Sequence, residues 1–422
     1  MSATPTHPSG RRPRSRATLR PARLSPPPPA LLHAPGETLP GAELLDDFRG
    51  PAGAALWLAL HDVHLWAATP PRDRARVFAP GALPRRLAAL GRAGVEPGPA
   101  VALLSLAALL LRDPGAADPA AVAAACLGIS AWAVERGAPA TGLAFAQAAA
   151  LATPDDPTAA LEAGTLALRR GDGARAESWL RRALVLARRA EANPAATGAC
   201  LGLGRIYAGR RQAVQARRFY LSAVGRARRS GLVREMAAAM HGLFDLARTG
   251  ATTDDADALA RGALLRYGSA HPRAPELLRD WIRFRRTRDL GASVLGGPGE
   301  ALPFRGPGPE RARLLAVVAQ EAAEAGAAEE FDRAWTRAWE LLGRHAPRTG
   351  GRAVVLLALG RAAAAAERWA MAEYAGQRAL EAAIAVDEAA EQAEAEAFLA
   401  DVWGRGGGMQ WIGSPHGPRC CE

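Results

Sequence analysis

Residues 203–224 read LGRIYAGRRQAVQARRFYLSAV, and the spacing of small and aromatic residues in this stretch decides the fold. Leu203 and Tyr207 lie one helical turn apart on one face, with Gly204 beside them. A second stripe follows with the i, i+4, i+7 spacing of a helix face, made of Ala216, Tyr220 and Ala223. Glycine and alanine let two helix axes approach closely, and the larger side chains fill the space beside them. The stretch therefore predicts a closely packed pair of helices joined by a short turn.

The same offsets recur elsewhere in the chain. Gly164 begins a copy 40 residues earlier, which continues through Ala167, Ala176, Leu180 and Ala183. Leu359 and Gly360 begin another, which continues through Ala363, Ala372 and Ala379 but has Gly376 where an aromatic residue is expected. A looser copy starts at Gly242 and continues through Ala256, Ala260 and Ala263. Residues 119–153 and 309–344 have the length of helix pairs but match the pattern poorly. No stretch shows the alternation of β-branched and aromatic residues that is typical of strands.

The order Leu-Gly-x-x-Tyr, followed by a small residue, an aromatic residue and a further small residue, resembles the tetratricopeptide repeat. The resemblance covers about residues 119–290 and 310–403. It implies an all-α fold, an α-solenoid of stacked antiparallel helix pairs with a right-handed superhelix, in a bacterial tetratricopeptide-repeat protein. The residues expected to pack helix against helix are Gly164, Ala176, Leu203, Gly204, Tyr207, Ala216, Tyr220, Ala223, Gly360, Ala372 and Ala379.

Composition shifts predict the organisation of the whole chain. The first 40 residues contain six arginines, one glutamate and the run SPPPPA, which favours disorder. Glycine and proline concentrate again near residue 300, where we expect a hinge, and after Trp403, where we expect a flexible tail. The predicted units are a tail (1–40), a helical leader (41–118), a repeat array (119–290), a hinge (291–309), a second repeat block with a terminal capping helix (310–403) and a tail (404–422).

The basic side chains limit the chemistry. The chain contains 53 basic residues and no lysine, so all of them are arginine. This composition is typical of a GC-rich bacterial genome, which also accounts for part of the net charge of +11. Without lysine there is no Walker-type phosphate loop, Schiff-base lysine or pyridoxal-phosphate anchor. The charge is nevertheless uneven, because residues 169–288 hold 25 arginines and 10 acidic residues, whereas residues 310–401 hold 10 arginines and 16 acidic residues.

The four cysteines and the N-terminus indicate the compartment. Cys126 and Cys200 fall in predicted helices, and Cys420 and Cys421 are adjacent near the C-terminus, so we expect no structural disulfide. The N-terminus lacks the apolar segment of a secretory signal. Residues 100–111 form the longest strongly apolar run, about half of the ~20 residues that a membrane span needs. We therefore expect a cytoplasmic protein without a membrane span.

No motif in the chain supports catalysis or a cofactor. His61 and His64 share a predicted helix face, but no third metal ligand is evident, and a histidine pair flanked by tryptophans is more typical of packing. His416 beside the two C-terminal cysteines is a weaker metal candidate. Gly202-x-Gly204 lies within a helix without a preceding strand, so it is not a dinucleotide-binding fingerprint. We expect a non-enzyme without a metal or cofactor.

The resemblance implies a protein-interaction scaffold that holds a peptide or amphipathic segment in a concave groove. By that analogy the groove consists of Leu161, Thr165, Arg169, Leu201, Arg205, Ala208, Leu357, Arg361 and Ala364. Arginine binds carboxylates bidentately, so an acidic and amphipathic partner segment is favoured. These arginines are also compatible with ordinary solvated helix surface. The alternative function is nucleic-acid or polyanion binding through the arginine-rich tail and the basic central repeats.

Overall fold

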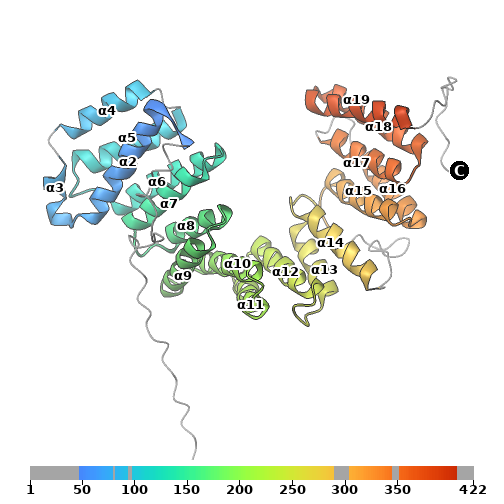
Figure 1. Cartoon of the computed structure of the whole chain (residues 1–422), viewed down its shortest axis with the longest axis horizontal. Coiled ribbons are helices and arrows are strands. Elements are labelled where there is room, and N and C mark those ends of the chain that lie inside the picture. Colours follow the sequence, from blue (N-terminus) through green and yellow to red (C-terminus); the bar gives the residue numbers. More distant parts are fainter. Residues whose placement is uncertain (1–46, 79–80, 94–96, 289–303, 345–350, 406–422) are drawn as a thin grey trace, which may run out of the picture.

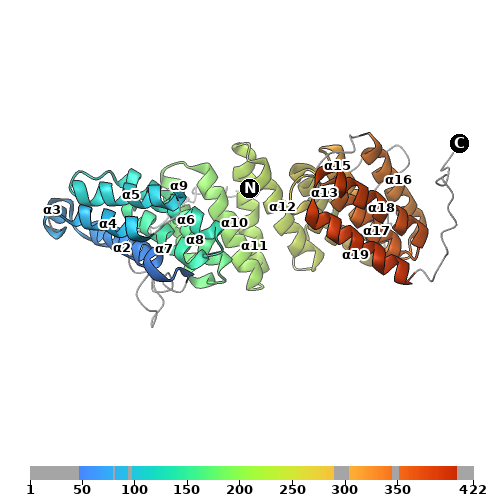
Figure 2. The ribbon, with the colours of Figure 1, turned by 90° about the horizontal axis from the view of Figure 1, so that it is seen from above.

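The computed structural model describes residues 47–78, 81–93, 97–288, 304–344 and 351–405, which are all-α, with no strand among them. The helices form a solenoid of stacked antiparallel pairs that curves into an arch (Figure 1). Viewed from above, the stack is elongated, with α10 to α12 between the two arms (Figure 2). The all-α repeat architecture predicted from the residue spacing is therefore confirmed. The expected tail at 1–40 lies outside the described residues, and so does the expected tail at 404–422 except for residues 404–405, which belong to the last helix.

Each unit of the stack consists of a first helix and a second helix. The N-terminal group contains α2 (Gly50–Ala68), α3 (Arg74–Val77), α4 (Ala82–Ala93) and α5 (Pro97–Arg112). Four pairs follow: α6 (Pro119–Glu135) with α7 (Pro139–Ala152), α8 (Pro157–Arg169) with α9 (Gly173–Arg189), α10 (Asn193–Gly209) with α11 (Ala213–Arg229), and α12 (Val233–Arg248) with α13 (Ala256–Tyr267). After α14 (Ala274–Thr287) come α15 (Gly308–Glu324) with α16 (Ala328–Gly343), α17 (Arg352–Ala365) with α18 (Trp369–Val386), and the terminal helix α19 (Ala389–Arg405).

The first helices line the inside of the arch. Along the chain α8 contacts α10, α10 contacts α12, α15 contacts α17 and α17 contacts α19. Figure 1 shows the second helices α9, α11, α16 and α18 on the outer side. The inner surface is therefore made by successive first helices, which are the helices that carry the predicted groove residues.

Each turn inside a pair contains one residue whose backbone adopts the left-handed conformation, with a positive φ. Gly171 joins α8 to α9 with φ +81°, and Arg211 joins α10 to α11 with φ +59°. The next backbone N–H then returns to the end of the first helix, as in the 2.9 Å hydrogen bond from Gln212 N to Tyr207 O. Aspartate side chains cap the N-termini of four helices, α6, α8, α9 and α13, through Asp118, Asp156, Asp172 and Asp255. Short turns of this kind hold consecutive helices antiparallel.

Tyr220 fixes the packing of the α10–α11 pair against the α12–α13 pair, because its ring lies between two glycines. A Cβ added at Gly204, on α10 of its own repeat, would lie 2.5 Å from Tyr220 Cε1. A Cβ added at Gly242, on α12 of the next repeat, would lie 2.5 Å from Tyr220 Cζ. Real Cβ atoms do not approach carbon this closely, so only glycine fits at both positions. The tyrosine thus sets the separation of three helices.

Leu180 takes the same place one repeat earlier. It lies between Gly164 of its own repeat and Gly202 of the next. A Cβ added at Gly164 would lie 2.8 Å from Leu180 Cγ, and one added at Gly202 would lie 2.6 Å from Leu180 Cδ1. The offset from the bulky residue to the following glycine is the same as for Tyr220. Each bulky residue therefore connects its own repeat to the following one.

In the second block the bulky residue comes from a different helix. Gly376 stands at the Tyr220 position, and the space is filled by Phe398 of α19. A Cβ added at Gly360 would lie 2.8 Å from Phe398 Cε1, and one added at Gly376 would lie 3.0 Å from Phe398 Cδ1. The aromatic residue that the sequence pattern lacks at position 376 is thus supplied by the terminal helix.

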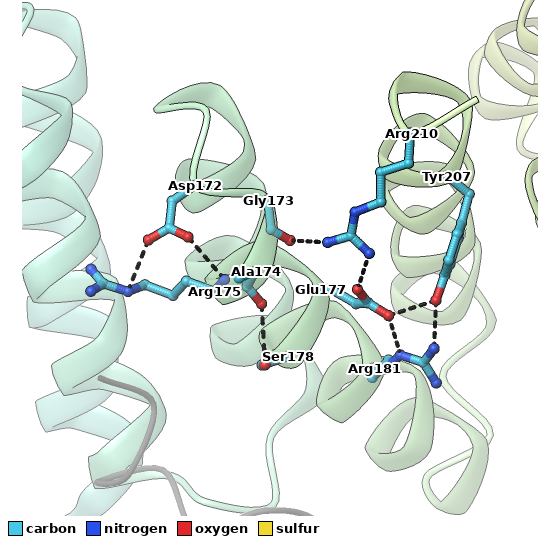
Figure 3. A network of polar contacts seen from close by, with 9 residues as sticks. All are labelled: Asp172, Gly173, Ala174, Arg175, Glu177, Ser178, Arg181, Tyr207 and Arg210. Carbon is cyan, nitrogen blue, oxygen red and sulfur yellow. Dashed lines mark hydrogen bonds and ion pairs between the residues drawn. The ribbon is translucent and has the colours of Figure 1, made fainter. Parts of the chain in front are cut away.

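Tyr207 joins its repeat to the preceding one through a polar network (Figure 3). Its ring stacks on Phe219 at 5.4 Å between centroids, and its hydroxyl donates a 2.5 Å hydrogen bond to Glu177 of α9. The same carboxylate accepts hydrogen bonds from Arg181 at 2.8 Å and from Arg210 at 2.5 Å. Burial alone would raise the pKa of the Glu177 carboxyl, but these three hydrogen bonds lower it to about 2.

The core does not divide at the expected hinge. Residues 289–303 lie outside the described residues, but Phe304 is 2% exposed and belongs to a cluster that runs from α12 to α19. Ser269 N donates a 2.8 Å hydrogen bond to Arg305 O, which ties the end of the hinge segment to the α13–α14 turn. The two hydrophobic clusters overlap on α12, where Leu243 belongs to one and Phe244 to the other. The two clusters therefore meet on α12.

Replacing Gly204 by alanine should destabilise the protein by about 1–3 kcal/mol, because the new methyl group overlaps the Tyr220 ring. Urea unfolding followed by circular dichroism measures the change. Gly209→Ala is the matched control, since it lies in the same helix with no atom within 4 Å of the added Cβ, and it should be neutral or stabilising. Equal losses in the two variants would contradict the packing role of Gly204.

Replacing Tyr207 by phenylalanine should lower the free energy of unfolding at pH 7 by about 1–2 kcal/mol, because Glu177 loses one hydrogen bond. The stabilisation from Glu177 is present above its ordinary pKa of 4.5 and is lost as the pH falls toward 2. The difference between wild type and variant should therefore shrink below pH 4. A difference that stays constant from pH 7 to pH 2.5 in urea unfolding experiments would show that the hydroxyl acts elsewhere.

Candidate binding surface inside the arch

The predicted groove residues all lie on first helices, but the structure does not bring all of them together. Leu161, Thr165 and Arg169 are on α8, and Leu201, Arg205 and Ala208 are on the adjacent α10. Leu357, Arg361 and Ala364 are on α17, in the other arm of the arch (Figure 1). The candidate surface is therefore the neighbourhood of α8, α10 and α12, and we call it the inner face.

Two of the predicted groove residues are core residues. Leu357 is 1% exposed and Leu201 is 8% exposed, so neither offers a side chain to a ligand. The physical reason is that first helices contact neighbours on both sides in the stack. The interpretation of these two leucines as ligand contacts was wrong. Leu161 is half-buried instead, and it packs against Gly198 of α10.

Arg361 also differs from the expectation. Its guanidinium donates a 2.6 Å hydrogen bond to Glu394 of α19, and both side chains are about half exposed. The carboxylate that was expected from a partner is thus supplied by the next first helix of the same chain. Thr165 is similarly engaged, because its hydroxyl donates to Leu161 O at 2.9 Å. Ala208 and Ala364 remain half-buried apolar contacts on the inner surfaces of the two arms.

Arg205 is the central cation of the inner face. It is exposed to solvent, and neither it nor Arg169 forms an ion pair with any residue that the structure describes. Burial nevertheless lowers the pKa of the Arg205 guanidinium, the charges of Arg273 and Arg169 lower it further, and Tyr220 and Tyr267 act in the opposite direction. Arg205 is therefore an exposed cation with like charges for neighbours.

Beside Arg205 the structure adds four residues that the sequence reasoning missed. The rings of Tyr267 and His271 stack with centroids 4.0 Å apart, and the His241 ring meets Tyr267 edge-on at 6.1 Å. His271 Nδ1 accepts a 3.2 Å hydrogen bond from the backbone N–H of Arg273, which brings the start of α14 to the same place. Residues from α12, the end of α13 and the α13–α14 turn thus meet at the inner face.

His241 and Tyr267 are both buried in this group. His241 is 6% exposed and Tyr267 is 8% exposed, and His241 Nδ1 forms no hydrogen bond with a described residue. His241 Nε2 lies 3.9 Å from Asp245. Burial raises the pKa of the Tyr267 hydroxyl, whereas the positive charges of Arg273 and Arg205 and a hydrogen bond with the Arg273 side chain lower it. Both rings therefore belong to the packed interior beneath the inner face.

The sequence contains one signal for His241. Aligned on their glycines, the repeats place Leu203, Leu359 and His241 at the same position, and Tyr207 and Asp245 at the same position. The Gly164 copy has Ala163 at this position, so His241 stands where the other repeats have an apolar residue. Tyr267 and Arg273 have no such signal, because they lie at a helix end and in a turn outside the repeat pattern.

Several other arginines of the basic central region are already paired with acids of the same chain. Arg217 donates two hydrogen bonds to Asp254, at 2.7 and 2.6 Å, and Arg283 donates two to Glu321, at 2.9 and 2.8 Å. Arg248 pairs with Asp245 at 2.9 Å and with Asp280 at 3.5 Å, so two acids near His241 share one positive charge. Arg169, Arg205 and Arg273 form no ion pair with a described residue.

The histidine pair of the leader is not assembled into a metal site. Asp62 accepts hydrogen bonds at 2.7 and 2.8 Å from Arg86, and His61 stacks on Trp57 with centroids 5.5 Å apart. No group of three or more candidate metal ligands occurs among the described residues. His416, Cys420 and Cys421 lie outside them. No helix of the described part is long and apolar enough to cross a membrane.

His241 should make stability depend on pH between 7.5 and 5. Burial lowers its pKa below 6.5, Arg273 lowers it too, and Asp245, Glu276 and Asp280 oppose the shift. The unfolded state therefore binds the proton first, so the free energy of unfolding falls as the pH drops below about 6.5. Urea unfolding of His241→Gln should show a smaller loss over this range than wild type. Identical pH profiles would contradict a buried, neutral imidazole.

The comparisons with known proteins supply no family for this chain. No family model matches it, and no curated protein matches it.

Proposed function

We propose that the protein is a non-catalytic interaction scaffold of the tetratricopeptide type, in the bacterial cytoplasm, whose inner face binds an acidic and amphipathic segment of a partner protein. The observation that supports this proposal is Arg205, an exposed guanidinium that forms no ion pair with a described residue and is repelled by the charges of Arg273 and Arg169. Keeping like charges together without a counter-ion is unfavourable, and a carboxylate-bearing ligand would relieve this repulsion.

The shape of the solenoid supports the same proposal. The adjacent first helices α8, α10 and α12 form one surface, and the half-buried apolar residues Leu161 and Ala208 lie on it together with Arg169 and Arg205. An acidic amphipathic segment would complement both kinds of residue. Its apolar side would contact the apolar residues of the helices, and its carboxylates would contact the arginines. General polyanion binding has less support, since many arginines of residues 169–288 are held by aspartate and glutamate side chains of the same chain.

Charge reversal at the inner face tests the proposal. The double variant Arg169→Glu and Arg205→Glu should lose specific partners in affinity purification from the native lysate, because like charges replace the salt bridges. The matched control is Arg218→Glu and Arg229→Glu, two exposed arginines of the outer helix α11 with the same change in net charge. Quantitative mass spectrometry compares wild type with both variants, and circular dichroism verifies that each is folded.

The control variant should keep the partners that the inner-face variant loses. Identical partner sets for wild type and the inner-face variant would contradict the proposal. Equal losses in both variants, together with steep salt dependence, would instead indicate a polyanion attracted to the basic surface as a whole.

A further inference from the structure

The two ends of the solenoid expose apolar side chains, although the terminal repeats of such a stack normally have polar outer faces. At the N-terminal end, α5 contains residues 100–111, the longest strongly apolar run of the chain. The structure leaves Val101 65% exposed, and Leu104 and Leu87 of the adjacent α4 are exposed too. A helix that is apolar on nearly all sides is normally buried, so we expect a surface outside the described residues to cover this end.

The N-terminal end is also positively charged. Together α4 and α5 contain four arginines and no acidic residue. Arg86 donates hydrogen bonds to Asp62 at 2.7 and 2.8 Å, whereas Arg85 and Arg92 are exposed and form no ion pair with a described residue. The exposed side chains of these two helices make up what we call the N-terminal tip, namely Arg85, Leu87, Arg92, Val101 and Leu104.

The C-terminal end has the opposite charge. The last helix, α19, packs against α17 and α18, and it contains four acidic residues and one arginine. Trp403 is 57% exposed there, and Glu396 is exposed and forms no ion pair with a described residue. The exposed side chains of α19 that we call the C-terminal tip are Ala393, Glu396, Ala397, Ala400, Asp401 and Trp403.

Charge favours one partner for the N-terminal tip. The first 40 residues of the chain, which lie outside the described residues, contain six arginines and one glutamate, so their charge has the same sign as that of the N-terminal tip. The C-terminal tip of a second copy instead offers carboxylates beside apolar side chains. It therefore complements the N-terminal tip both in charge and in apolar surface.

The shape of the molecule allows both tips to be covered at once. Figure 1 shows α4 at the end of one arm of the arch and α19 at the end of the other, both on the side toward which the arch opens. A second copy turned by 180° in the plane of Figure 1 therefore presents its α19 to α4 of the first copy, and its α4 to α19. The two contacts are related by the two-fold axis, so the assembly closes.

We propose that two copies of the chain form a closed ring in which the N-terminal tip of each copy binds the C-terminal tip of the other. Arg85 and Arg92 then face the carboxylates of α19, while the apolar side chains of both tips are removed from water. This inference goes beyond the proposed function and does not depend on it, because no residue of the inner face takes part in the contacts.

Sedimentation velocity of the full-length protein, combined with charge reversal at the tips, tests the ring. Wild type should sediment as a dimer at about 10 µM. The N-tip variant is Arg85→Glu with Arg92→Glu, and the C-tip variant is Glu396→Arg with Asp401→Arg. Each variant alone should dimerise about tenfold or more weakly than wild type, because like charges then meet at both contacts. Circular dichroism verifies that each variant is folded.

An equimolar mixture of the two variants gives the sharpest readout. In a mixed ring one contact joins the two reversed tips and the other joins the two unchanged tips, so opposite charges meet at both. The mixture should therefore recover the dimer. The matched control is Arg218→Glu with Arg229→Glu on the outer helix α11, which changes the net charge as much as the N-tip variant does and should remain dimeric.

The remaining outcomes each overturn the ring. A wild type that stays monomeric up to about 100 µM would show that no second copy covers the tips. Loss of the dimer in only one of the two tip variants would show that one tip binds its own counterpart, and a dimer in both would place the contact on another surface. A mixture that stays monomeric would show that the two tips are not partners. Larger species that grow with concentration would show that the contacts do not close.

Discussion

The close approach of helices across glycine is the constraint on which the rest of the structure depends. Tyr220 occupies the space left by Gly204 and Gly242, and Leu180 occupies the corresponding space one repeat earlier. Because each bulky side chain contacts its own repeat and the next, the same contact forms the pair and orders the stack. The curvature of the inner face, and with it the position of Arg205, follows from this spacing.

The sequence was sufficient for this part of the structure, because the packing unit is local. Gly204, Tyr207 and Tyr220 lie within 17 consecutive residues, and their offsets correspond directly to helix faces. Interactions between repeats were harder to predict. Phe398 replaces the aromatic residue absent at Gly376, but it belongs to another helix, and a pattern defined within one repeat does not include it.

The candidate site was predicted only in part, for a related reason. Arg205 was identified from its place on a first helix, whereas Tyr267 and Arg273 reach it from a helix end and a turn more than 60 residues away. Leu201 and Leu357 were assigned to the groove because one face of a first helix was taken to be free, although neighbouring helices cover it. Arg361 was assigned as a free cation because the opposing Glu394 belongs to the next unit.

The overlap of the two hydrophobic clusters on α12 has a mechanical consequence. Leu243 and Phe244 are consecutive residues, yet they belong to different clusters. A displacement of α12 would therefore disturb the packing of both arms at once, which couples their orientations mechanically.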